Sequence, residues 1–64
     1  MSLYEKIKAL CKEKGISIYE CEKRAGLGNG VIGGWQKSIP MFNKIEAVAR
    51  VLEVPVDYFT EEQK

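Results

Sequence analysis

The chain has 64 residues, of which 45% are hydrophobic and 30% charged, with a formal net charge of +1 and no histidine. This length allows one domain at most, expected over residues 1–64, and the composition is typical of a globular chain. No apolar run approaches the ~20 residues that cross a bilayer, and Lys6 and Lys8 interrupt the stretch where a secretion signal needs apolar residues, so we expect no membrane association and a cytoplasmic protein.

The first predicted helix covers about residues 3–14. Ser2 and Glu5 form an S-x-x-E capping box at its start, and Gly15 stops it. Between them, apolar residues recur at helical spacing: Leu3, Ile7, Leu10 and Cys11.

A second capping box, Ser17 with Glu20, predicts a helix that starts at about residue 18, with Ile16 and Cys21 in the positions of a hydrophobic staple. Gly26 is placed to end it in the left-handed conformation. A third helix is expected over residues 29–36, because Val31, Ile32 and Trp35 make one apolar stripe. That spacing favours a core position for Trp35 over base stacking or ligand binding. Two short helices joined by a glycine turn are typical of a helix-turn-helix, which presents its second helix to the DNA major groove.

After a break at residues 37–40, closed by Pro40, the cleanest amphipathic pattern in the chain predicts a fourth helix. Its expected core residues are Phe42, Ile45, Val48, Ala49 and Leu52. Pro55 is placed to open a short fifth helix, in which Val56, Tyr58 and Phe59 are candidates for core or for a dimer surface. The predicted fold class is all-α, a compact bundle of five short helices with a central helix-turn-helix.

The chemistry-bearing residues do not favour an enzyme. Without histidine, and with Glu20 and Glu22 on different sides of a helix, no catalytic arrangement is evident. Cys11 and Cys21 fall on apolar helix faces, which favours free thiols that behave as small hydrophobes over a disulfide, and two cysteines do not make a zinc site. We therefore expect no metal, no cofactor and no small-molecule substrate. Residues 57–64 carry a net charge of −2, which leaves a mildly basic +3 for residues 1–56.

An ordered set of features runs through residues 3–60: Gly15-Ile16-Ser17, Ala25-Gly26-Leu27, Val31-Ile32, Trp35, Pro40, Leu52, Val54 and Asp57-Tyr58-Phe59. In this order they resemble the Cro/lambda-repressor-like helix-turn-helix family, particularly the small phage-repressor-like regulators. The resemblance implies a sequence-specific DNA-binding regulator of transcription, complete in itself or the N-terminal domain of a longer protein. It also implies a homodimer on a palindromic operator of double-stranded DNA.

Carried over by position, the base-facing residues of that family fall on Asn29, Gly30, Gly33 and Gly34, and the phosphate-facing residues fall on Ser17, Lys37, Ser38 and Lys44. Only Asn29 among the first four has a side chain able to read a base, by pairing with adenine.

The glycines of this set have two explanations. Small residues let the helix backbone approach the duplex closely, with specificity from Asn29 and from DNA shape. Alternatively, base recognition has been lost and the fold serves as a protein-interaction or dimerisation module, antitoxin-like or anti-repressor. Placed inside a helix, Gly30, Gly33 and Gly34 together are expected to cost roughly 3 kcal/mol relative to alanine.

Overall fold

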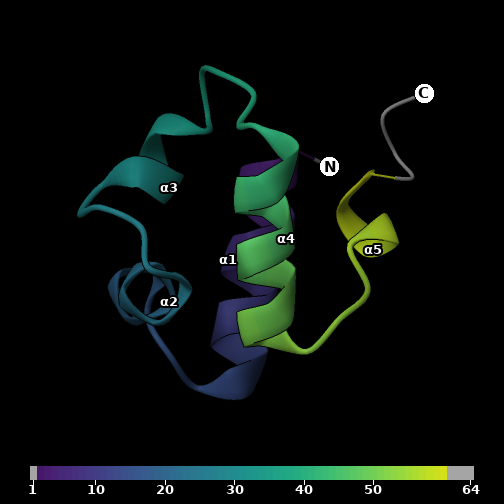
Figure 1. The fold of residues 1–64 in the computed structure, drawn as a ribbon. Helices are drawn as coiled ribbons and strands as arrows, with labels where there is room; N and C mark the ends of the chain where they lie inside the picture. The colour runs from purple at the N-terminus through teal and green to yellow at the C-terminus, as the bar shows by residue number, and fades with distance from the viewer. Residues whose placement is uncertain (1, 61–64) are drawn as a thin grey trace.

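The computed structural model describes residues 2–60, and within that range it contains five helices and no strand (Figure 1). In chain order these are α1 (Leu3–Lys14), α2 (Ile18–Ala25), α3 (Val31–Gly34), α4 (Phe42–Leu52) and α5 (Asp57–Thr60). α1 packs against α4, with α2 and α3 to one side of this pair and α5 to the other (Figure 1). The predicted all-α bundle of five short helices is confirmed.

None of these five helices combines the length and the apolar content that crossing a membrane requires. Glu61, Glu62 and Lys64, which contribute to the acidic end of the sequence, lie outside the described residues.

The start and end of α1 agree with the sequence pattern. The backbone N–H of Glu5 donates to Ser2 Oγ at 3.2 Å, and the backbone N–H of Ser2 donates to Glu5 Oε1 at 3.4 Å, so both halves of the capping box are formed. The helix ends at Gly15, whose backbone is left-handed. The predicted range of residues 3–14 is therefore confirmed.

The start of α2 is simpler than predicted. Ser17 Oγ accepts a hydrogen bond from the backbone N–H of Glu20 at 3.0 Å, which is the first half of a capping box. The Glu20 carboxylate does not complete it but accepts from Arg24 Nε at 3.1 Å, one turn further along the helix. An arginine four residues away competes successfully for this carboxylate because the pair shares one helix face. Gly26 ends the helix in the left-handed region, as predicted.

α3 is shorter than the predicted range of residues 29–36. It spans Val31–Gly34, and beyond it the backbone N–H groups of residues 35–37 each donate to the carbonyl three positions back, which is the tighter 3₁₀ pattern. Gly30 precedes the helix with a φ of 84°. The expectation of three interior glycines was therefore wrong, because Gly30 lies outside the helix and only Gly33 and Gly34 lie within it. Low helix propensity at the two glycines explains why α-geometry ends here.

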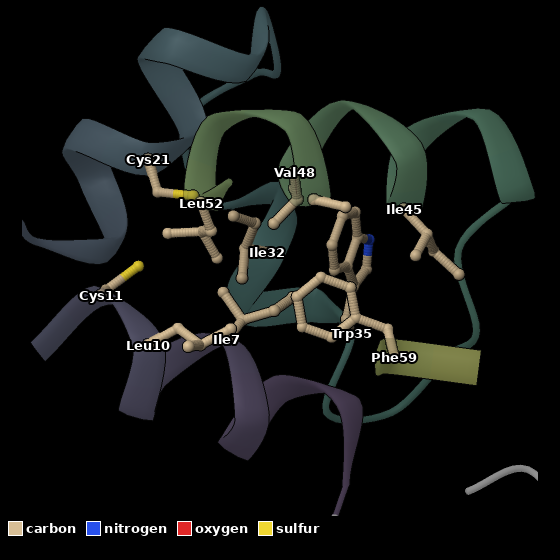
Figure 2. Packing of buried hydrophobic residues seen from close by; sticks show 11 residues of the cluster. Ile7, Leu10, Cys11, Cys21, Ile32, Trp35, Ile45, Val48, Leu52 and Phe59 are labelled. Atoms are coloured by element: carbon tan, nitrogen blue, oxygen red, sulfur yellow. The ribbon is translucent and has the colours of Figure 1, made fainter. Parts of the chain in front are cut away.

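The hydrophobic core lies between α1, α2 and α4 and is closed by residues from α3 and α5 (Figure 2). Trp35 and Phe59 both point into it, so the predicted core position of Trp35 is confirmed and Phe59 is core. The prediction that Phe42 lines the core is wrong, because its side chain is 55% exposed. It occupies the first position of α4, and burial within the predicted stripe begins only at Ile45. The buried members of the predicted α4 stripe are Ile45, Val48, Ala49 and Leu52.

Candidate nucleic-acid interface

The segment from α2 to α3 is held by one buried carboxylate that the sequence pattern did not single out. Glu22, on α2, is only 3% exposed. Its Oε1 accepts a hydrogen bond from the backbone N–H of Gly30 at 3.0 Å, and its Oε2 accepts one from the backbone N–H of Ile32 at 2.9 Å. The first N–H groups of a helix have no partner inside that helix, and Gly30 has no side chain to supply one. Glu22 therefore provides the cap for α3 from the neighbouring helix.

The four residues predicted to face bases lie close together, in the turn before α3 and in α3 itself. Asn29, Gly30 and Gly34 are exposed, and Gly33 is half-buried. A Cβ atom built at Gly33 or Gly34 would meet no other atom within 4 Å, so nothing inside the protein requires glycine at these two positions. At Gly30 the positive φ itself disfavours other residues.

The residues predicted to face phosphates come from three different segments. Ser17 is exposed at the start of α2, and its hydroxyl hydrogen is still available because the oxygen acts as the acceptor for Glu20. Ser38 Oγ donates to the carbonyl of Gly34 at 3.3 Å, so its hydroxyl must rotate before it can donate to a phosphate. Lys37 is exposed in the connection after α3, and Lys44 is half-buried in the first turn of α4.

The positive charges near α3 differ in how far they are already neutralised. Arg24 forms an ion pair with Glu20. By contrast, no ion pair involves Lys37 or Lys44 among residues 2–60. Their full charge is therefore available to an external anion.

A short run of exposed apolar side chains, which we call the 39–42 patch, lies between these two lysines in the sequence and was not predicted as a surface feature. It consists of Ile39, 85% exposed, Met41, 70% exposed, and Phe42. The apolar run around Pro40 was the available signal, but residues 37–40 were interpreted as a break between helices and Phe42 as a core residue. Exposed apolar clusters of this kind are typical of contact surfaces.

The two thiols lie in the core and not at this surface. Cys11 and Cys21 are buried on the inner sides of α1 and α2, and both are free (Figure 2). Burial raises the pKa of the Cys21 thiol to about 12, with a further increase from the neighbouring Cys11, and burial also raises the pKa of Cys11. Within residues 2–60, no group of three metal-ligating side chains occurs. The prediction that the cysteines are free and behave as buried hydrophobes is confirmed.

No protein-family model, curated protein or solved structure matches this chain. Its own residues therefore carry any assignment of function.

Proposed function

We propose that the chain is a sequence-specific DNA-binding regulator of transcription, of the phage-repressor type, which acts in the cytoplasm as a homodimer on a palindromic operator. The observation that carries the proposal is the exposed outer surface of the turn and α3, held on α2 by Glu22. Lys37 follows α3 in the connection to α4 and Lys44 lies in the first turn of α4, and neither forms an ion pair within residues 2–60. Short side chains on this surface and unpaired cations next to it suit a groove lined by phosphates.

In this proposal, most of the affinity comes from the phosphate backbone. Lys37 and Lys44 neutralise phosphates, and the Ser17 hydroxyl donates to one at the N-terminus of α2, where the helix dipole favours an anion. Asn29 is the one side chain that reads a base edge. Gly33 and Gly34 let the backbone of α3 approach the groove, and the remaining specificity comes from the shape and deformability of the duplex.

The experiment that tests this function is selection from a random duplex library at low and at physiological salt, followed by sequencing of the retained DNA. An enriched palindrome supports a dimeric regulator and measures its half-site spacing. Retention at low salt without enrichment reduces the function to phosphate binding, because that component of affinity is independent of sequence and falls steeply with salt. Absence of retention at both salt concentrations contradicts DNA binding.

A second candidate is a protein-interaction module whose helix-turn-helix no longer reads bases. The 39–42 patch favours it, because apolar side chains so exposed lose nothing by contacting a protein partner. Polar substitutions at Gly33 and Gly34 distinguish the two candidates. A gain of site-specific affinity with an unchanged oligomeric state would indicate lost readout, whereas a loss of affinity indicates that the glycines are needed for close approach.

A further inference from the structure

The contact between Glu22 and the start of α3 joins two helices and does not merely cap one. The carboxylate reaches backbone N–H groups 8 and 10 positions further along the chain, across the glycine turn. Both of its oxygens are used, and the residue is almost completely buried. A charged acceptor forms stronger hydrogen bonds than a neutral one, particularly where water is excluded.

This contact also determines which donors remain for DNA. The Glu22 carboxylate accepts hydrogen bonds from the N–H groups of Gly30 and Ile32. These two N–H groups are therefore not free donors for DNA.

We propose that Glu22 is a positioning residue for sequence reading: its carboxylate sets the orientation of the turn and α3 against α2. This inference rests on the proposed function. Its consequence is that Glu22 acts on the discrimination between DNA sequences without touching DNA. Sequence-independent binding depends on the lysines, and Glu22 does not change it.

The deciding variant is Glu22→Gln, which conserves size but removes the charge and one of the two acceptor oxygens. The affinity for the duplex obtained by selection is expected to fall about tenfold, which corresponds to the loss of one strong hydrogen bond. The affinity for a random duplex, and the dependence of binding on salt, should not change. Backbone hydrogen exchange at Gly30 and Ile32 should become faster than in the unsubstituted protein.

Three further variants keep the test decisive. Glu20→Gln makes the same change on the exposed side of α2 and should leave specificity intact. Val48→Ala lowers stability through the core, and at a temperature where it is folded it should bind as the unsubstituted protein does. If Glu22→Gln does not fold, Glu22→Asp replaces it. This variant keeps the charge but shortens the reach by one methylene, and it should show the same selective loss to a smaller extent.

The possible outcomes separate the two proposals. Equal losses for selected and random duplexes, or a loss matched by Val48→Ala, would overturn positioning while leaving the proposed function standing. If the unsubstituted protein retains no duplex, the function fails and positioning for DNA fails with it. Faster exchange at Gly30 and Ile32 would then reduce Glu22 to a structural cap.

Discussion

Lys6 and Tyr58 join the first and last helices across 52 positions of sequence. Lys6 Nζ donates a hydrogen bond to the backbone carbonyl of Tyr58 at 2.7 Å, and the same ammonium lies 5.1 Å from the centroid of the Tyr58 ring. The neighbouring Phe59 is buried in the core, with its ring edge-on to that of Tyr58. The lysine thus supplies a donor to a backbone carbonyl of α5, a short helix that would be unstable in isolation.

Replacing Lys6 should loosen α5. Lys6→Met keeps an apolar side chain of similar length but removes the charged donor, and the free energy of unfolding should fall by about 1–3 kcal/mol. Urea denaturation followed by Trp35 fluorescence measures this change. Lys8→Met, at an exposed position on the same helix, is the matched control and should shift it by less than about 0.5 kcal/mol. Equal effects of the two substitutions would contradict the role given to Lys6.

Alanine substitutions of the glycines around α3 should change the free energy of unfolding in opposite directions, depending on the position. Gly33→Ala and Gly34→Ala meet no steric obstacle and should each raise the free energy of unfolding by about 0.5–1 kcal/mol. Gly30→Ala forces a side chain into a left-handed backbone and should lower it by about 1–2 kcal/mol. Thermal or urea denaturation of the three variants tests the sign. A stabilising Gly30→Ala would show that the turn does not need its positive φ.

The same alanine variants test the close approach of α3 to DNA. If the backbone of α3 lies against the groove, the added methyl groups of Gly33→Ala and Gly34→Ala should weaken binding to the selected duplex even though they stabilise the fold. Binding titrations well below the melting temperature measure this effect. Unchanged affinity for both variants would argue that the glycines do not face the duplex.

The lysines beside α3 should control how binding depends on salt. Lys37→Ala and Lys44→Ala are each expected to weaken binding to all sequences alike and to reduce the slope of log affinity against log salt by about 1. Lys12→Ala is the control, because it lies in the last turn of α1, at the end of the bundle away from the connection between α3 and α4 (Figure 1). An unchanged slope for Lys37→Ala would remove this residue from the phosphate contacts.

The buried thiol of Cys21 should make the fold sensitive to high pH. Its pKa is raised from an ordinary 9.0 to about 12, so the folded protein keeps a proton that the unfolded chain loses. Stability is therefore fully present below pH 9 and is lost as the pH rises towards 12, by at most about 1.4 kcal/mol per pH unit for one group. Unfolding free energies measured across this range should fall more steeply for the unsubstituted protein than for Cys21→Ala. Parallel curves would contradict the effect.

The helices of this chain were predictable to the extent that their signals are local. The Ser2 capping box, the glycines that end α1 and α2, and the 3.6-residue apolar stripe of α4 all act within one or two helical turns. Phe42 and α3 were predicted less well. Whether the first apolar residue of a helix is buried depends on which neighbouring element packs against that end of the helix. The length of a glycine-rich helix depends on its contacts with the rest of the protein, because glycine itself has low helix propensity.

For the candidate site, the sequence by itself determined which residues are near one another along the turn and α3, since Asn29, Gly30, Gly33 and Gly34 fall within a few positions. Only the tertiary structure decided what holds them. In the sequence, Glu22 was considered only as an acid on a different side of the helix from Glu20, and its burial against the N–H groups of Gly30 and Ile32 arises because the turn brings the start of α3 onto α2. A carboxylate signals its charge in the sequence, but its hydrogen-bond partners are set by folding, which brings distant backbone groups within 3 Å of it.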